Sequence, residues 1–523
     1  MREEGGFSVF DDAENEAELV DEPVDEEFPA DGENVDPLLP ASSLSPRLPP
    51  RELVDGAVLQ PLVDIGSGGG DADDDEAEAH REAEAALRTA ASPAALAARD
   101  SFEVYSDEPP ADAQAAQLRG DAAGAGHASM LVNPFSPGAV EEALAALDEP
   151  VASMQGVTVE DESAAERLES SLSAARRRPK QGAVLALSGF RYILGKLCGR
   201  GAYADIYEAI DEDDADSDGG GGAEGDARQV PAAASAPATL ALKVVRPPDA
   251  AAVAWEFAVL RRVAQRVPPL ERPLFLQARR LHMAGPNCVL VAPFGAHGTL
   301  QDAVNASLRA AGRVGCMPES LAAYFTIELL RCLEVLHAAG FIHADVKPDN
   351  VLLRNCAAGW DDAWAPGRPG SWRERGLALI DFGRSIDLAT HAPGTLFCGD
   401  CGTENFRCVE MQTGAPWTFQ ADTFCALGCV HAMLWGTYMD IDHDADAQRW
   451  RRRAPLRRYW HAELWEPFFD ALLNVPSCDA QPALADFRAS FEAFLAAPER
   501  ALEVRAQLME LTVLMHEQAA KAA

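Results

Sequence analysis

The sequence predicts an α+β fold of two lobes, a small lobe rich in β-strands followed by a larger helical lobe. Three observations indicate this fold. Short alternating apolar segments occupy residues 188–297, helical patterns dominate residues 298–523, and a polar motif at 343–350 is followed after about thirty residues by a second one at 379–383. With 48% hydrophobic residues, the 523-residue chain can bury a substantial core.

The chain opens with an acidic segment. Residues 1–129 carry 32 acidic and 7 basic side chains, and the formal net charge of the whole chain is −39. Such a composition cannot bury enough apolar surface to offset chain entropy. We therefore predict a mostly disordered region, with a short helix near residues 82–98 as the exception.

Two strands are predicted at the start of the small lobe. Gly199 and Gly201 interrupt an alternating apolar pattern that continues through Ala204 and Ile206. The pattern predicts a turn that covers the phosphates of a nucleotide. A G-x-G pair alone is a weak indication of such a turn, and Ala204 stands where a third glycine is usual.

The next strand follows an acidic, glycine-rich insert at about residues 211–237, which we predict to be a disordered flap. Lys243 is the one cation in the apolar run 239–245. A lysine in a strand is usually only an exposed side chain, but in this order it matches the lysine that holds the α- and β-phosphates. Its expected partner is Glu256, in a segment of helical composition. The alternative is that Glu256 lies on a solvated helix face.

The larger lobe contains the spacing of a phosphoryl-transfer loop, an aspartate with a lysine two residues and an asparagine five residues later. These residues are Asp345, Lys347 and Asn350, and Asp381 follows in an Ile-Asp-Phe-Gly sequence. We expect Asp345 to orient and deprotonate a substrate hydroxyl while Lys347 meets the charge on the transferred phosphate. Asn350 and Asp381 are expected to hold the Mg²⁺ that binds ATP.

Three further residues are predicted to support this loop. His343 lies within it, Asp422 matches a buried aspartate that anchors the loop backbone, and Glu410 ends a peptide-positioning segment. The motifs together predict the two-lobed eukaryotic protein-kinase fold. Ala344 stands where many kinases place an arginine that binds an activation-loop phosphate. We therefore predict that activity does not depend on phosphate capture at that position.

Several segments resemble one family of kinases. They are residues 255–257, 343–350, 380–387, 408–411, 416–422, 436–439 and 473–476. They resemble the budding-uninhibited-by-benzimidazole (BUB) family of mitotic spindle-checkpoint kinases, and residues 130–187 resemble the N-terminal extension of its kinase domain. We identify no segment that resembles the family's tetratricopeptide helices or its propeller-docking motif. The resemblance implies a Ser/Thr kinase of the nucleus and of mitotic kinetochores and centromeres, with a core histone tail among its substrates.

Two short motifs in the acidic segment indicate a partner. Both have the order Phe, any residue, Val, aromatic, any residue, acid. Their residues are Phe7, Val9, Phe10 and Asp12, and Phe102, Val104, Tyr105 and Asp107. This order resembles the ABBA motif, by which checkpoint proteins bind the WD-repeat co-activator of the anaphase-promoting complex. The rings and the valine would fill apolar pockets of such a partner while the acids meet basic rims.

Two functional classes stay open. The first is an active Ser/Thr kinase, and the second is a catalytically inactive pseudokinase scaffold that acts through its linear motifs. The intact chemical positions favour the enzyme, because drifting pseudokinases commonly lose metal-binding or phosphate-binding side chains. A kinase of small molecules is disfavoured by the peptide-positioning segment.

The sequence also indicates what is not expected. All 11 cysteines follow residue 197, which suits reduced thiols, and the lone C-x-x-C at 398–401 has no second pair to complete a zinc site. No run of about twenty apolar residues predicts a membrane span, and we expect no sequence-specific binding of nucleic acid. A basic cluster at residues 449–458 indicates either a contact with acidic chromatin or a solvated face.

Overall fold

The computed structural model of the chain describes residues 130–161, 163–177, 182–200, 204–212, 239–247, 249–311, 317–355 and 363–522. The predicted acidic region, its short helix and both six-residue motifs therefore lie outside the described residues. Gly201 and most of the predicted insert lie outside them as well.

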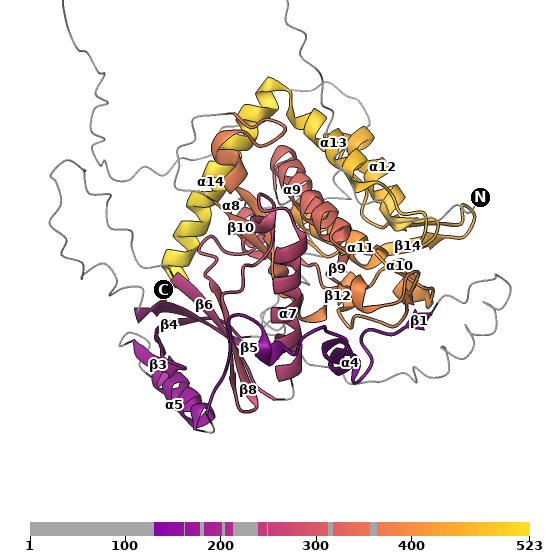
Figure 1. The fold of residues 1–523 in the computed structure, drawn as a ribbon. Helices are drawn as coiled ribbons and strands as arrows, with labels where there is room; N and C mark the ends of the chain where they lie inside the picture. The colour runs from indigo at the N-terminus through magenta and orange to yellow at the C-terminus, as the bar shows by residue number, and fades with distance from the viewer. Residues whose placement is uncertain are drawn as a thin grey trace, which may run out of the picture. The chain divides into compact units, whose positions relative to one another are not determined.

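The small lobe is built on one sheet of seven strands (Figure 1). The spatial order is β2-β7-β8-β6-β5-β4-β3, and all neighbours are antiparallel except β2 and β7. The strands are β2 (Val157–Val159), β3 (Ala183–Leu187), β4 (Phe190–Arg200), β5 (Ala204–Asp211), β6 (Thr239–Val245), β7 (Arg280–Ala284) and β8 (Asn287–Pro293).

Alternation of side chains along β6 decides where its lysine points. Leu242 and Val244 are buried in a core that the sheet shares with α5 (Ala164–Arg177). Because neighbouring residues of a strand point to opposite faces, Lys243 faces the other side. On that side α7 (Ala250–Arg266) packs against the sheet.

One predicted boundary shifts slightly. Asp211, which we placed in the insert, is the last residue of β5. Its side chain is buried, and its Oδ2 lies 2.7 Å from Nη1 of Arg280 in β7. The strand continues to Asp211 because this residue pairs with Tyr192 of β4, and the insert follows it.

The residues before the small lobe form an extension that touches both lobes. Helix α4 (Ala139–Ala145) and the 3₁₀ turn η1 (Val151–Ser153) pack on α7. Strand β1 (Leu131–Val132) pairs in parallel with β13 (Leu396–Phe397) of the large lobe. The extension also adds β2 to the edge of the sheet and lays α5 over its outer face.

The large lobe is mostly helical and also carries short strand pairs. Its helices are α8 (Leu300–Ala311), α9 (Glu319–Ala338), α10 (Val409–Thr413), α11 (Gln420–Trp435), α12 (Ala462–Leu473), α13 (Leu484–Leu495) and α14 (Pro498–Ala522). Its antiparallel strand pairs are β9 (Phe341–Ile342) with β12 (Ile386–Asp387), β10 (Val351–Arg354) with β11 (Gly376–Leu379), and β14 (Ile441–Asp444) with β15 (Arg449–Arg452).

The core of this lobe surrounds α9 and α11. Helix α11 is buried from Gln420 to Leu434, so it is covered on all sides rather than amphipathic, and the polar side chain of Asp422 is among its buried residues. Within the described residues, no helix combines the length and the apolar character needed to cross a membrane. The buried α11 provides a fixed base under the loop that precedes β10.

Candidate active site

Three charged side chains from distant parts of the chain meet where the two lobes join. Nζ of Lys243 lies 2.7 Å from Oε2 of Glu256 in α7 and 2.7 Å from Oδ1 of Asp381, which follows β11. The side chain of Glu256 is buried, whereas 41% of the Asp381 side chain is exposed. Asp381 is therefore the member of this group that is open to a ligand.

The charge states of this group follow from burial and pairing. Burial disfavours the ammonium form of Lys243, but the two carboxylates outweigh burial and raise its pKa. Burial also acts on Asp381, where Lys243 outweighs it and holds the pKa of the carboxyl below its usual value. Burial raises the pKa of Glu256, an effect that Lys243 opposes. Lys243 and Asp381 are thus both charged at neutral pH.

A second group lies in the loop that holds Asp345. Oδ2 of this residue accepts hydrogen bonds from Nζ of Lys347 at 2.8 Å and from Nδ2 of Asn350 at 2.9 Å. Oδ1 accepts a hydrogen bond of 3.2 Å from Oγ1 of Thr403. Both oxygens are held from different sides, so the orientation of the carboxylate is fixed.

Ile380 joins the two groups. Its N–H donates to the carbonyl of Asn350 at 3.0 Å, and its carbonyl lies 3.0 Å from Nε2 of His343. Nδ1 of His343 accepts a hydrogen bond of 3.3 Å from the N–H of Asp345. These contacts assign the proton of a neutral ring to Nε2. His343 thereby holds the Asp345 loop against the strand end that presents Asp381.

Asp422 anchors the same loop from below. Its carboxylate, which is fully buried in α11, accepts hydrogen bonds from the backbone N–H of His343 at 2.8 Å and of Ala344 at 2.7 Å. Nε2 of His337 in α9 lies 2.8 Å away. Ala344 has a φ of 62°, a left-handed conformation that costs energy for a residue with a Cβ. The two hydrogen bonds to Asp422 stabilise this strained turn.

The remaining predicted residues lie at different places around the two groups. Gly199 in β4 is paired with Ile206 in β5, and Ile206 is paired with Lys243 in β6. Ala204, which we expected in the turn, is the first residue of β5. Glu410 is half-buried in α10, and burial raises the pKa of its carboxyl. It contacts neither charged group directly.

The side chains present fit Mg²⁺ and a nucleotide phosphate. Asn350 donates from Nδ2 to the carbonyl and the carboxylate of Asp345. Its amide oxygen and Oδ2 of Asp381 make no hydrogen bond within the described part of the chain. Carboxylate and amide oxygens are the hard donors that Mg²⁺ prefers. Lys243 is the charged group beside them that suits a phosphate oxygen.

Two features of the site were missed by the sequence reasoning. One is the contact of Thr403 with Asp345, and the other is the pairing of Asp387 with arginines of α7. Asp387 lies within the family-like segment 380–387, but no role followed from it. Both contacts join residues that are far apart in the chain, so no local sequence pattern predicts them.

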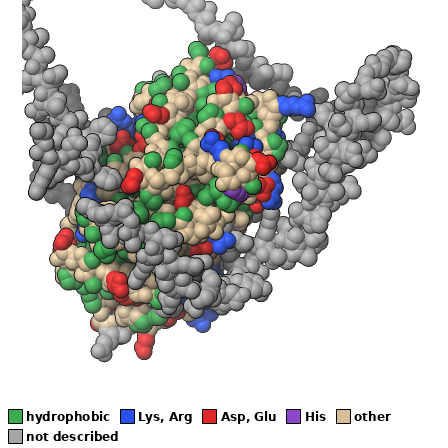
Figure 2. Space-filling model, turned by 90° about the vertical axis from the view of Figure 1, so that its right-hand side faces the viewer, with side chains coloured by type: hydrophobic (Ala, Val, Ile, Leu, Met, Phe, Trp, Pro, Cys, Tyr) green, Lys and Arg blue, Asp and Glu red, His purple; other side chains and the backbone are tan. Residues whose placement is uncertain are grey.

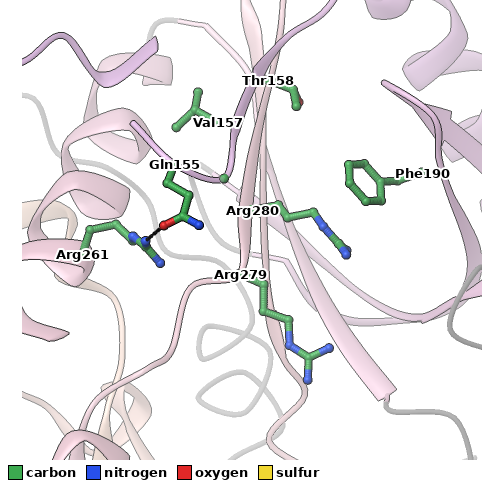
Figure 3. Close-up of a pocket in the computed structure, with 8 residues that line it drawn as sticks. Gln155, Val157, Thr158, Phe190, Arg261, Arg279 and Arg280 are labelled. Atoms are coloured by element: carbon green, nitrogen blue, oxygen red, sulfur yellow. Dashed lines mark hydrogen bonds between the residues drawn. The ribbon is translucent and has the colours of Figure 1, made fainter. Parts of the chain in front are cut away.

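A surface hollow of about 370 Å³ lies apart from these groups and shares no residue with them. It is bordered by the turn before β2, by α7 and by the start of β7. Figure 3 shows Arg261 of α7 bonded to Gln155, and Arg280 beside Phe190. Arg280 also pairs with Asp211. The hollow contributes no group to the phosphoryl-transfer chemistry.

The basic cluster at residues 449–458 lies partly on the β14–β15 hairpin and is largely neutralised. Four of its arginines pair with acids of the hairpin and α12 at 2.6–3.1 Å. The pairs are Arg449 with Asp470, Arg451 with Asp444, Arg452 with Glu466, and Arg453 with Asp442. Figure 2 shows basic and acidic side chains interspersed on the face it presents. This arrangement favours a solvated face over a contact with chromatin.

Comparison with known proteins places these observations in a family context. The protein-family model described as Protein kinase domain matches residues 222–463. The mitotic checkpoint serine/threonine-protein kinase BUB1 of Arabidopsis thaliana is 34% identical over 330 residues, which cover 62% of this chain and 58% of that protein. The protein of the same name from Mus musculus is 32% identical over 300 residues, which cover 57% of this chain and 25% of that protein.

A solved structure supports the fold. The fold is similar to that in the crystal structure of the BubR1 kinase domain, with a TM-score of 0.58 and 24% sequence identity. The matched region covers 73% of this chain and 100% of the BubR1 chain. The predicted two-lobed protein-kinase fold is thereby confirmed. The chain spans little more than half of the Arabidopsis relative and about a quarter of the mouse relative. Residues 222–463 match the protein kinase family, and the chain is similar to mitotic checkpoint kinases named BUB1.

Proposed function

We propose that this protein is an active, ATP- and Mg²⁺-dependent Ser/Thr protein kinase of the mitotic spindle checkpoint. One observation carries the proposal. The Lys243, Glu256 and Asp381 group and the Asp345, Lys347 and Asn350 group are intact and are joined through Ile380 at the boundary of the lobes. A pseudokinase under no demand for chemistry has no reason to keep all six side chains paired within these two groups.

The first group would bind the phosphates of the nucleotide and their metal ion. Bound MgATP would supply the phosphoryl group that is transferred. Lys243, held by Glu256, is placed to pair with phosphate oxygens. Asp381 and the amide oxygen of Asn350 are placed to hold the metal. Because Lys243 is charged and mostly buried, its interaction with phosphate is stronger than at an exposed site.

The second group serves the substrate hydroxyl. Asp345 orients this hydroxyl and accepts its proton, since the carboxylate is fixed from three sides. Lys347 stabilises the negative charge that develops on the transferred phosphate. Thr403 and His343 keep the carboxylate and its loop in place. In this scheme Gly199, Ala204 and Ile206 cover the nucleotide from the small lobe.

A phosphate-transfer assay tests the proposal. The full chain would be incubated with radiolabelled ATP, Mg²⁺ and a histone mixture, with Asp345→Asn as the matched control. We expect the variant to lose roughly a hundredfold or more of the activity. Equal incorporation by both proteins would exclude the enzyme and leave the alternative, a pseudokinase scaffold.

The finer proposal for the substrate is a core histone tail at centromeres, during mitosis, in the nucleus. It is supported by the resemblance to the checkpoint kinases. Recombinant nucleosomes with each histone tail deleted in turn would identify the acceptor. Phosphorylation that is unchanged by every deletion would contradict this substrate.

The second part of the proposal is binding of the WD-repeat co-activator of the anaphase-promoting complex through the two Phe-containing motifs. It is supported by the repeated spacing of aromatic residues, valine and acid in the sequence. Pull-down of the purified co-activator by the full chain would be compared with Phe7→Ala, Phe102→Ala and the double variant. We expect binding to weaken in each single variant and to be lost in the double variant. Equal binding by all four proteins would contradict the proposal.

A further inference from the structure

A single buried carboxylate joins α7 to the segment that follows Asp381. The side chain of Asp387 is 0% exposed and accepts hydrogen bonds from two arginines of α7. Nε of Arg262 lies 2.6 Å from Oδ2, and Nη1 and Nη2 of Arg266 lie 2.7 Å from Oδ1 and 2.9 Å from Oδ2. The N–H of Ala389 adds a fourth bond, of 3.0 Å. All acceptor directions of the carboxylate are used by charged or backbone donors.

The arginines and their partner lie on elements that present the reacting groups. Arg262 and Arg266 are on the same helix as Glu256, about two and three turns further along. Asp387 is in β12, four residues after Gly383, and is paired with Phe341 in β9. Strand β9 leads directly into the Asp345 loop. The carboxylate therefore connects the helix of Glu256 with both parts of the candidate active site.

Further contacts join α7 to the segment after Asp381 and to the loop that holds Asp345. Nε1 of Trp255 in α7 donates a hydrogen bond of 2.7 Å to the carbonyl of Ser385, and Oγ of Ser385 donates one of 3.2 Å to the carbonyl of His343. The guanidinium of Arg266 also lies 4.5 Å from the centre of the Phe341 ring. Asp387 is the one acid in this set, and its single carboxylate is shared by the two arginines.

The chemistry of this contact resembles that of a phosphorylated loop. A phosphate orders a kinase segment because its oxygens pair with arginines. Here the arginines of α7 already have a bidentate, buried anionic partner encoded in the sequence. Ala344 stands at the position where many kinases have the arginine that binds this phosphate. No covalent modification is needed to supply the negative charge.

We propose that Asp387 is a positioning residue that replaces an activation-loop phosphate, holding α7 so that Glu256 reaches Lys243. The inference deepens the proposed kinase function and rests on it for its effect on turnover. Its structural part, the tethering of α7, stands independently of catalysis. Loss of the negative charge leaves Arg266 without its buried carboxylate partner and leaves Arg262 with only the exposed Asp148 at 3.8 Å, which favours outward movement of α7.

The test compares Asp387→Asn with Glu334→Gln in the full chain. Glu334 in α9 forms a comparable two-bond pair with Arg488 in α13, at 2.7 and 3.1 Å, away from the active site. Two quantities would be measured: kcat and KM for ATP, and hydrogen–deuterium exchange of residues 250–266 without nucleotide. Wild-type protein treated with phosphatase would be assayed in parallel.

We expect Asp387→Asn to lower kcat/KM for ATP by roughly tenfold to a hundredfold and to speed exchange in α7. Glu334→Gln should change neither by more than about twofold, and phosphatase treatment should leave the wild type unchanged. Asp387→Glu should recover part of the loss, because it restores the charge. If Asp387→Asn does not fold, Arg262→Gln removes the other side of the same contact and is expected to give the same changes.

The outcomes separate this inference from the proposed function. Slow exchange in α7 and unchanged kinetics in both Asp387→Asn and Arg262→Gln would overturn the inference while leaving an active kinase. Dependence of wild-type activity on phosphatase-sensitive phosphate would overturn it as well. Faster exchange in Asp387→Asn, with no phosphate transfer by any protein, would retain the tether and contradict the kinase.

Discussion

Thr403 donates a hydrogen bond of 3.2 Å from its Oγ1 to Oδ1 of Asp345. Thr403 precedes the 3₁₀ turn at Glu404–Phe406, in the segment between β13 and α10. The other carboxylate oxygen of Asp345 is occupied by Lys347 and Asn350. The orientation of the proposed base therefore depends on a hydroxyl from the segment between β13 and α10.

Replacing Thr403 by Val tests this dependence, since valine keeps the shape of the side chain and removes the hydroxyl. We expect kcat to fall by roughly tenfold, because Asp345 loses one of its fixed contacts, while KM for ATP stays within about twofold. Thr403→Ser, which retains the hydroxyl, is the matched control and should keep most of the activity. Steady-state kinetics that show equal kcat for Val and Ser would contradict a positioning role.

Glu256→Gln tests the ion pair in the small lobe. The change keeps the size of the side chain but removes one of the two carboxylates that hold Lys243. Lys243 is then drawn to Asp381, which we propose as a metal ligand. We expect the affinity for MgATP, measured by calorimetry without turnover, to fall by about tenfold. Glu169→Gln is the control, because Glu169 pairs at 2.8 Å with Arg246 in the same lobe and is 44% exposed. Similar affinities for the two variants would exclude a specific role for Glu256.

The parts of the site that could be predicted are those set by short-range geometry. Asp345, Lys347 and Asn350 lie within six residues, so their spacing alone brings them together. The direction of Lys243 follows from the alternation of Leu242 and Val244 along one strand. The protein-kinase fold followed from the order of these local patterns.

The parts that could not be predicted depend on partners far apart in the sequence. Thr403 is 58 residues from Asp345, and Arg262 is 125 residues from Asp387. Other hydroxyl and acidic residues of the segment between Asp381 and Glu410 could make these contacts as well as Thr403 and Asp387. Only the folded structure shows which residues do. The basic cluster gave an undecided prediction because its partners depend on the folded hairpin and on α12. Arg451 pairs with Asp444 and Arg453 with Asp442 within the hairpin, whereas Arg449 and Arg452 pair with acids of α12.

Asp422→Asn is expected to destabilise the fold at neutral pH. Burial favours the neutral acid, but hydrogen bonds from His337 and from the backbone of His343 outweigh burial and lower the pKa of Asp422. A carboxyl with a pKa below its unfolded value stabilises the fold above that unfolded value and loses the contribution as the pH falls through the folded pKa. The free energy of unfolding in urea should thus fall by about 3 kcal/mol in the variant at pH 7.

The pH dependence distinguishes this effect from a simple loss of packing. The difference between wild type and Asp422→Asn should be constant from pH 8 to about pH 5 and shrink below about pH 4, where the carboxyl of the unfolded wild-type chain takes up a proton while the folded one stays ionised. Asp442→Asn, on the exposed hairpin, should leave the free energy of unfolding nearly unchanged. A difference that stays the same down to pH 3 would show that the charge of Asp422 contributes nothing.

Gly399→Ala tests the contact between the extension and the segment that carries Thr403. Gly399 has a φ of 88°, and a Cβ at this position would collide with the side chain of Asn133, beside the β1–β13 pairing. Gly394 has a similar φ of 79° with open space around it, so Gly394→Ala measures the conformational cost alone, about 1 kcal/mol. We expect both variants to lower the melting temperature, but Gly399→Ala to lower it further and to reduce kcat by roughly tenfold, because the displaced segment leads to Thr403. Equal kcat in the two glycine variants would show that the extension does not position this segment.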